Sequence, residues 1–260
     1  MNKKKAIVNL GSLLNPVQKK IVSPALNNVF GHLVDSKFVI IGHARTGSNY
    51  LLDGLMSSKS VAAYHEIFAD HNRKIGEDFG EVLSQLYRKE GRSVKIVGFK
   101  LFYNHLTEDE WQKFLAYKEF KVIHLTRENY LRTIVSLDIA FKTDEWTRSS
   151  YARRRQLTDK RISLDTYNLI QRLENIRKFE SQTRSRFKDR SMFEVVYEEM
   201  IRNPHTVFQN VGEFLGIDGI DFTKIKIVKQ NPEKLDQLII NFNEVSHLLK
   251  DSRFANCLYE

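Results

Sequence analysis

Residues 39–52 constrain the fold of this chain most strongly, because an apolar run ends there in a polar turn that contains a glycine. The residues Val-Ile-Ile at 39–41 are typical of a buried strand, which Gly42 closes. A helical pattern follows, with apolar residues on one face at 51, 52, 55 and 56. Strand, turn and helix in this order predict a phosphate cradle, in which backbone N–H groups and a helix N-terminus face an anion.

Gly42 and Gly47 have the spacing of a P-loop, but the residues after Gly47 do not fit one. A P-loop continues with Lys and then Ser or Thr, which contact the outer phosphates and Mg²⁺. Here Ser48 and Asn49 take those places, and the cation is Arg45. The turn is therefore predicted to bind a phosphate-like anion with arginine, not a metal ion, as the counter-charge. The alternative is an ordinary strand-to-helix turn with an N-cap serine.

Strands and helices alternate through 37–141, which predicts a single α/β domain with a central parallel sheet flanked by helices. The expected strands are 37–42, 61–64, 94–100, 121–125 and 192–197. The expected helices are 48–58, 78–90, one opened by a Thr107–Glu110 capping box, 130–141, 163–186, 204–215 and 233–249. In the helix 130–141 an apolar face carries one charged residue, Asp138.

The pattern divides the chain into four segments. Residues 1–36 form a basic N-terminal extension, 37–141 a nucleotide-binding core, 142–162 a basic lobe on the open side of the sheet, and 163–260 the C-terminal helices and the remaining strand. The net charge of +9 favours an anionic partner such as a nucleotide, a polyanion, nucleic acid or an acidic membrane. Apolar residues at 17, 21, 22 and 26 predict a short helix packed on the domain edge, and the lysines at 3–5 allow the alternative of peripheral contact with a membrane.

The chain has one cysteine, Cys257, and no apolar run that approaches 18 residues. A single cysteine excludes an intrachain disulfide and suits a reducing compartment, so we expect a cytoplasmic protein without a transmembrane helix. One cysteine also cannot form a cysteine-based structural zinc site within the chain.

A second polar turn follows the expected strand 121–125 and begins at Arg127. Ser136 lies nine residues further, in the next expected helix. Parallel strands end at one edge of a sheet, where open α/β sheets bind their ligands. Two anion sites at that edge suit a nucleotide that is phosphorylated at both ends, and ATP or GTP needs only one.

Three stretches together resemble the sulfotransferase family. Residues 45–51 (RTGSNYL) are similar to the 5′-phosphosulfate loop in the form found in bacterial carbohydrate sulfotransferases. Residues 125–137 resemble the 3′-phosphate motif, 196–216 resemble the segment that usually follows it, and 229–232 look like the tail of the nodulation-factor and trehalose sulfotransferases. The resemblance implies a P-loop-like core that binds 3′-phosphoadenosine-5′-phosphosulfate (PAPS), through Arg45, Thr46, Gly47, Ser48, Asn49, Tyr50, Arg127 and Ser136.

The resemblance also implies that a sulfuryl group moves from PAPS to an acceptor hydroxyl, on a carbohydrate or glycolipid in this branch, without a metal and with PAP as product. Arg45 is expected to neutralise the departing phosphate, since arginine cannot act as a general acid. Glu66 is the preferred base, because the neighbouring Ile67 and Phe68 are expected to desolvate it and raise its pKa. His105 and His65 are the alternative bases, and Lys100, at the end of the third expected strand, is a further cation at this edge.

Two other functions compete with sulfuryl transfer. A nucleotide kinase would need the lysine and the Mg²⁺ ligand that the first turn lacks. A polyanion- or nucleic-acid-binding module would use the arginines at 148–161, but aromatic residues do not alternate with them in a stacking pattern apart from Tyr151. The sequence leaves the acceptor and the oligomeric state open.

Overall fold

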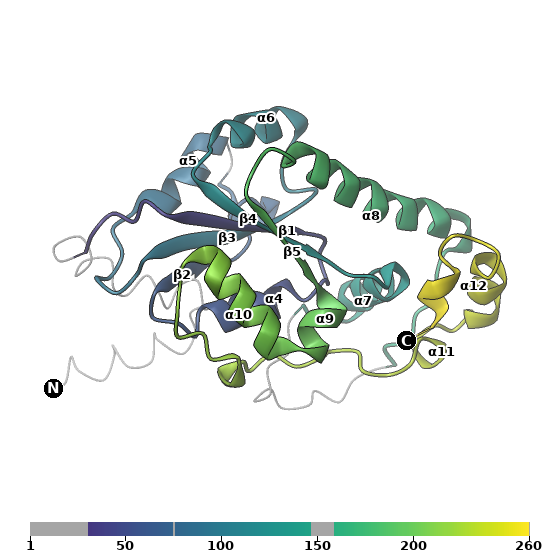
Figure 1. The fold of residues 1–260 in the computed structure, drawn as a ribbon. Coiled ribbons are helices and arrows are strands. Elements are labelled where there is room, and N and C mark those ends of the chain that lie inside the picture. The colour runs from purple at the N-terminus through teal and green to yellow at the C-terminus, as the bar shows by residue number, and fades with distance from the viewer. Residues whose placement is uncertain (1–30, 75, 147–158, 260) are drawn as a thin grey trace, which may run out of the picture.

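The computed structural model describes residues 31–74, 76–146 and 159–259. At its centre is a five-stranded parallel sheet in the order β2-β3-β1-β4-β5 (Figure 1). The strands are β1 (Lys37–Gly42), β2 (Val61–Tyr64), β3 (Ile96–Phe102), β4 (Phe120–Thr126) and β5 (Met192–Val196). The predicted α/β architecture with a parallel sheet flanked by helices is confirmed.

β1 shows why this sheet is covered on both faces. Val39 and Ile41 pack into one hydrophobic cluster, and Phe38 and Ile40 pack into another on the opposite face. Alternate side chains of a strand point to opposite faces, so an unbroken apolar run requires helices on both. Gly98 of β3 makes room for this packing, because a Cβ atom there would lie 2.3 Å from the ring of Phe38.

Helices cover both faces of the sheet (Figure 1). One face carries α5 (Phe79–Ser84), α6 (Glu108–Ala116) and α8 (Thr166–Arg186), and the other carries α4 (Ser48–Leu55), α9 (Tyr197–Arg202) and α10 (Pro204–Leu215). A third hydrophobic cluster joins α8 to α7 (Tyr130–Thr143), α11 (Leu235–Leu238) and α12 (Phe242–Leu249). Short 3₁₀ turns are η2 (Asp70–Asn72), η3 (Gln85–Tyr87), η4 (Phe222–Lys224) and η5 (Ala255–Leu258).

Most expected elements are present, with shifted ends. Of the helices expected at 48–58 and 78–90, the first stops at Leu55 and the second is α5 followed by η3. The expected helix 233–249 is two short helices, α11 and α12. The third strand is displaced from 94–100 to Ile96–Phe102, so Lys100 lies inside β3 and not at its end. The Thr107 capping box of α6 is confirmed.

Asp138, the charged residue on the apolar face of α7, is bound by α8. Its carboxylate accepts hydrogen bonds from both terminal nitrogens of Arg172, at 2.5 and 2.8 Å. A bidentate ion pair of this kind allows a charged side chain to lie in a helix–helix contact. The apolar residues of the same face are buried, namely Leu131, Ile134, Val135 and Ile139.

Part of the expected organisation lies outside the described residues, namely most of the extension 1–36 and most of the basic lobe 142–162. Among the residues that the structure describes, no helix has both the length and the apolar character to cross a membrane. The division of the chain into four segments stays a prediction.

Candidate active site

The first turn connects β1 to α4 in a conformation that only particular residues allow. Gly47 has φ +88° and precedes α4. A Cβ atom at Gly47 would lie 2.5 Å from the ring of Tyr197, so the position requires glycine. Thr46 closes the turn by donating its hydroxyl to the carbonyl of His43 at 2.7 Å.

The N-terminus of α4 carries the donors that an anion needs. In the described part of the chain no side chain caps this helix, so its first amides keep their hydrogen-bonding capacity. Ser48 is buried at the first helical position, and Asn49 and Tyr50 are partly buried after it. The ring of Tyr50 packs against Phe208 of α10 at 6.0 Å between centroids.

Arg45 reaches from the first turn to α7. It has φ +69°, a left-handed conformation that is uncommon for a residue with a side chain. Its Nε donates to the hydroxyl of Ser136 at 3.0 Å. Its terminal nitrogens donate to the carbonyl of Trp146 at 2.5 Å and to the side-chain oxygen of Gln230. Burial and the nearby charge of Arg127 lower its pKa.

The second turn holds Arg127 against the first. Arg127 is buried at the end of β4 and donates to the carbonyl of Arg45 at 3.0 Å. Its guanidinium lies over the ring of Tyr197, 4.5 Å from the centroid, and its Nε is 3.6 Å from the carboxylate of Glu198. Glu198 also accepts from the backbone N–H of Glu128 at 3.0 Å, which fixes the turn. Arg45, Arg127 and Ser136, far apart in the sequence, therefore lie together.

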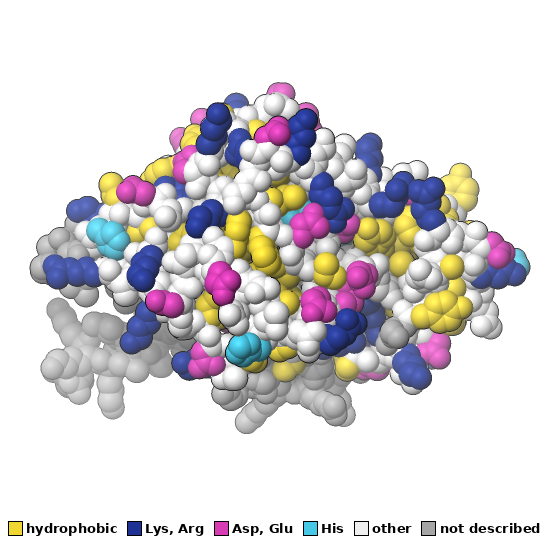
Figure 2. Space-filling model, in the orientation of Figure 1, with side chains coloured by type: hydrophobic (Ala, Val, Ile, Leu, Met, Phe, Trp, Pro, Cys, Tyr) yellow, Lys and Arg dark blue, Asp and Glu magenta, His cyan; other side chains and the backbone are white. Residues whose placement is uncertain are grey.

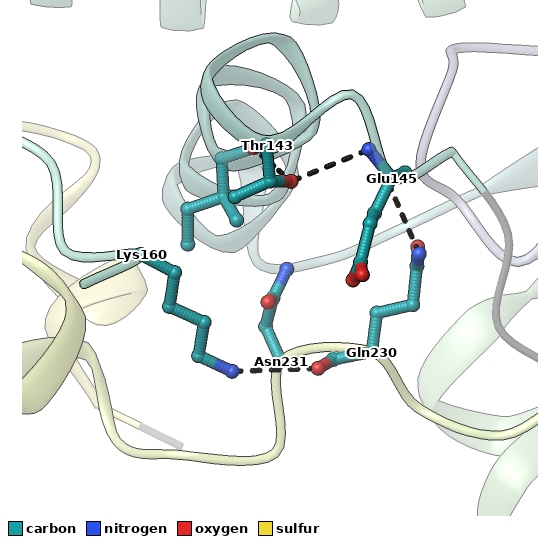
Figure 3. Close-up of a pocket in the computed structure, with 6 residues that line it drawn as sticks. Thr143, Glu145, Lys160, Gln230 and Asn231 are labelled. Carbon is teal, nitrogen blue, oxygen red and sulfur yellow. Dashed lines mark hydrogen bonds between the residues drawn. The ribbon is translucent and has the colours of Figure 1, made fainter. Parts of the chain in front are cut away.

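The C-terminal part of the chain completes this site (Figure 3). Asn231 is buried, and its side-chain amide lies 3.4 Å from the hydroxyl of Ser136. Gln230 donates to the carbonyl of Glu145 at 3.1 Å, and Lys160 pairs with Glu233 at 2.7 Å. A cavity of about 10 Å³, room for one water molecule, is lined by Ile139, Thr143, Glu145, Lys160, Gln230 and Asn231. The sequence alone indicates no role for Gln230, Asn231 or Glu198, although each falls in a stretch that resembles the sulfotransferase family.

A second group of polar side chains lies on the other side of β1. Lys100 of β3 is 1% exposed, and its ammonium donates to the carboxylate of Glu66 at 2.8 Å and to the side-chain oxygen of Asn49. Even-numbered residues of β3 point to the face that α4 covers, which brings Lys100 to the first turn of that helix. Lys100 therefore connects Glu66, the expected base, to the first turn, which is predicted to bind an anion.

The expected rise in the pKa of Glu66 is wrong. Burial does raise it, but the charge and the hydrogen bond of Lys100 outweigh burial, so the pKa of Glu66 lies below its usual value. Glu66 keeps 24% of its side-chain surface exposed, while its neighbours Ile67 and Phe68 turn into the core. The carboxylate is thus ionised at neutral pH and accessible from solvent.

His105 is poorly suited to be the base. Its Nδ1 accepts the backbone N–H of Phe102 at 3.2 Å, so in the neutral ring the proton sits on Nε2. The only free lone pair of the neutral ring, on Nδ1, is therefore already engaged. Burial also lowers the pKa of His105 to about 4, which makes the ring a weak base. His65 contributes its backbone carbonyl to the N–H of Lys100 at 3.3 Å.

The residues described above meet at one edge of the sheet, where β1, β3 and β4 end side by side. Gly42 of β1 lies between Phe102 of β3 and Leu125 of β4, so the turns after β1 and β4 and the end of β3 are adjacent. Among the described residues, no group of three or more His, Cys, Asp or Glu could hold a metal ion.

Comparison with known proteins gives one family match. A family model described as Stf0 sulphotransferase matches residues 37–244. No curated protein sequence matches the chain.

Similar solved structures include a sulfotransferase from Alicyclobacillus acidocaldarius, with 17% identity, 85% of this chain and 92% of that chain covered, and a TM-score of 0.48. Mouse sulfotransferase SULT7A1 complexed with PAP has 15% identity, with 76% and 65% covered and a TM-score of 0.44. The sulfotransferase domain of the Synechococcus PCC 7002 olefin synthase has 16% identity, with 82% and 84% covered and a TM-score of 0.44.

Proposed function

The chain belongs to the Stf0 sulphotransferase family and is a PAPS-dependent sulfotransferase, and we propose that it sulfates a hydroxyl of a carbohydrate or glycolipid by in-line displacement without a metal ion. The observation that carries this proposal is the hydrogen bond of 2.8 Å between Lys100 and Glu66, directly beside the anion-binding turn. In this pair the cation and the carboxylate that we propose as the base are in contact beside the first turn of α4.

The residues present fit PAPS. Arg127, Ser136 and Asn231 would hold the 3′-phosphate, with the guanidinium of Arg45 beside them. The amides of residues 46–49 and the hydroxyl of Ser48 would hold the 5′-phosphate end at the N-terminus of α4. Tyr50 belongs to the same helix and would contact the nucleoside. PAPS supplies an activated sulfuryl group whose departure leaves PAP.

In the reaction, Glu66 takes the proton of the acceptor hydroxyl. The hydroxyl oxygen forms a bond to sulfur while the bond from sulfur to the 5′-phosphate oxygen breaks, and negative charge passes to that phosphate. Lys100 and the α4 amides neutralise the departing charge, and Arg45 adds a positive charge between the two phosphate sites. Positioning and charge stabilisation supply most of the rate enhancement in phosphoryl transfer, and we infer the same here.

A metal ion is not needed in this proposal because Lys100 takes over its electrostatic role. Asn49 stands where a P-loop has the hydroxyl ligand of Mg²⁺, and its side chain accepts from Lys100. Activity that persists in EDTA is therefore expected, and a requirement for Mg²⁺ would favour the kinase reading.

The acceptor class is inferred from the loop that follows Glu66. Asp70, His71 and Asn72 are exposed there, which provides hydrogen-bonding groups for a molecule rich in hydroxyls. The lone cysteine agrees with a reducing, cytoplasmic location. The test is a screen of mono- and disaccharides, glycolipids and phenols with ³⁵S-labelled PAPS, alongside calorimetric titration with PAP. Transfer to a sugar hydroxyl is expected, and exclusive transfer to phenols would overturn the carbohydrate assignment.

A further inference from the structure

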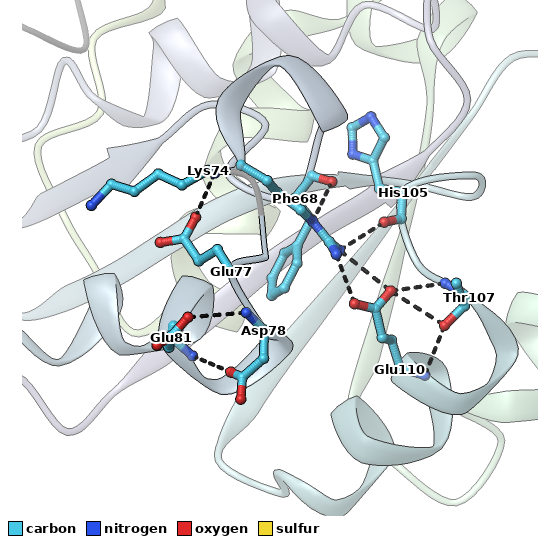
Figure 4. Close-up of polar contacts among 9 residues, drawn as sticks. Phe68, Lys74, Glu77, Asp78, Glu81, His105, Thr107 and Glu110 are labelled. Carbon is cyan, nitrogen blue, oxygen red and sulfur yellow. Dashed lines mark hydrogen bonds and ion pairs between the residues drawn. The ribbon is translucent and has the colours of Figure 1, made fainter.

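One arginine ties the loop that carries Glu66 to the loop that follows β3. Arg73 Nε donates to the carbonyl of Phe68 at 3.1 Å, and its NH2 donates to the carbonyl of His105 at 3.1 Å. Its NH1 pairs with the carboxylate of Glu110 at 2.7 Å. Figure 4 shows these two carbonyls and the Glu110 carboxylate converging on one guanidinium.

The ion pair between Arg73 and Glu110 is largely buried, and the capping box of α6 holds Glu110 in place. Arg73 and Glu110 keep only 18% and 14% of their side-chain surface exposed, so water screens them less than an ordinary surface pair. Glu110 also accepts the backbone N–H of Thr107 at 3.0 Å in the capping box of α6. Because α6 packs on the sheet through Phe114, Arg73 has a rigid partner.

On the other side of Arg73, its hydrogen-bond partner Phe68 lies two residues after Glu66. Phe68, whose carbonyl binds Arg73, is fully buried and stacks on Phe79 at 5.1 Å between centroids. The carbonyl of Glu66 accepts from the side chain of Asn72 at 2.8 Å. A shift at Arg73 would thus move the backbone that carries the Glu66 carboxylate.

We propose that Arg73 is a positioning residue for sulfuryl transfer: by tying residues 65–73 to the loop after β3, it holds the Glu66 carboxylate on Lys100 and beside the acceptor hydroxyl. This inference rests on the proposed role of Glu66 as the base. PAPS binding does not depend on the connection, because Arg127, Ser136 and the α4 amides come from other elements.

The test replaces Arg73 and its partner separately. In Arg73→Gln and Glu110→Gln we expect hydrolysis of PAPS, with water in place of the acceptor, to fall about 10- to 100-fold, the usual cost of a small misplacement. The acid limb of the pH–rate profile should move to higher pH as Glu66 loses Lys100. The dissociation constant of PAP should stay within about twofold, and amide hydrogen exchange of 65–73 should speed up. The double variant should be no worse than Arg73→Gln, since both changes break one connection.

Arg190→Gln is the matched control. Arg190 also donates to backbone carbonyls, with 2.9 Å to Tyr117, and lies 5.7 Å from the ring centroid of Phe187, but it precedes β5 at the opposite edge of the sheet. It should keep the wild-type rate and pH profile. Arg73→Lys should recover part of the rate, and it serves as the test if Arg73→Gln does not fold.

Two results would overturn the inference. One is a folded Arg73→Gln protein with the wild-type rate and acid limb, while Glu66→Gln is inactive. The other is a loss of PAP affinity as large as the loss of rate, which would indicate general damage to the fold. If Glu66→Gln itself keeps full activity, the proposed base is wrong, and that result is independent of Arg73.

Discussion

Arg45 and Ser136, 91 residues apart in the sequence, are joined by a hydrogen bond of 3.0 Å from Nε to Oγ. The bond connects the turn after β1 with the helix after β4, which are neighbours because β1 and β4 pair in the sheet. Two predicted anion sites are therefore parts of one continuous site. The bond also holds the Arg45 guanidinium on the side of Ser136, and Lys100 is the cation that contacts Glu66.

The first prediction concerns Ser136. Ser136→Ala removes the hydroxyl that Arg45 and Asn231 contact, and we expect PAP to bind about 10-fold more weakly, the usual effect of losing a hydrogen bond to a charged group. The affinity for 5′-AMP, which lacks the 3′-phosphate, should not change. Calorimetric titration of both nucleotides measures this. Thr183→Ala, which removes a buried hydroxyl of α8, is the control and should bind both like the wild type. Equal weakening for PAP and 5′-AMP would rule out a 3′-phosphate contact.

Lys100 gives a second prediction, on both rate and pH. Lys100→Met removes the strongest influence that lowers the pKa of Glu66, so burial weighs more and the pKa of Glu66 rises. The acid limb of the rate profile should move to higher pH, and turnover at pH 7 should fall about 10²–10³-fold from the lost charge stabilisation.

A matched control for this change is Lys37→Met. Lys37 is also buried, but it lies at the start of β1 and donates to the carbonyl of Val34 at 3.3 Å, at the edge away from the site. It should keep the rate profile of the wild type. An unchanged acid limb in Lys100→Met would show that Glu66 does not govern it.

A third prediction is that the protein loses stability between pH 6.5 and about 4 through His124. His124 is fully buried, accepts or donates to Tyr103 at 2.9 Å, and has its pKa lowered by burial to about 4. In the unfolded chain its pKa is near 6.5, so as the pH falls below 6.5 the unfolded state binds the proton first. The stability present above pH 6.5 is lost progressively until the folded state also protonates near pH 4.

Urea unfolding at several pH values measures this loss. Protonation of His124 in the unfolded chain should lower the free energy of unfolding by roughly 3 kcal/mol between these two pH values. His124→Asn should have a lower stability at pH 7 and a flatter dependence on pH than the wild type. An equally steep dependence in that variant would assign the loss to other groups, such as His105, whose pKa is also lowered to about 4.

The elements that the sequence predicted correctly depend on local patterns. The apolar run of β1 and the capping box of α6 each involve residues a few positions apart, so one sequence contains the whole signal. The ends of β3 were predicted two residues too early, because Lys100 interrupts the apolar pattern and a buried lysine is explained only by its partners.

The parts that could not be predicted depend on distant contacts. Asn231 meets Ser136 across 95 residues, and Glu198 meets the turn of Arg127 across 70. The pKa of Glu66 had the wrong predicted direction for the same reason. The two residues that follow it, Ile67 and Phe68, are apolar, but the cation that decides the direction of the shift lies 34 residues away in β3.

The role of Glu66 is the central claim, and single-turnover sulfuryl transfer by Glu66→Gln tests it most directly. The substitution keeps the size of the side chain and removes its capacity to take a proton. Enzyme in excess over ³⁵S-labelled PAPS should convert it to product or, without an acceptor, to sulfate about 10²–10⁴-fold more slowly than the wild type, the usual contribution of a positioned base. PAP should bind with unchanged affinity. A Glu66→Gln protein that transfers the sulfuryl group at the wild-type rate would contradict the account.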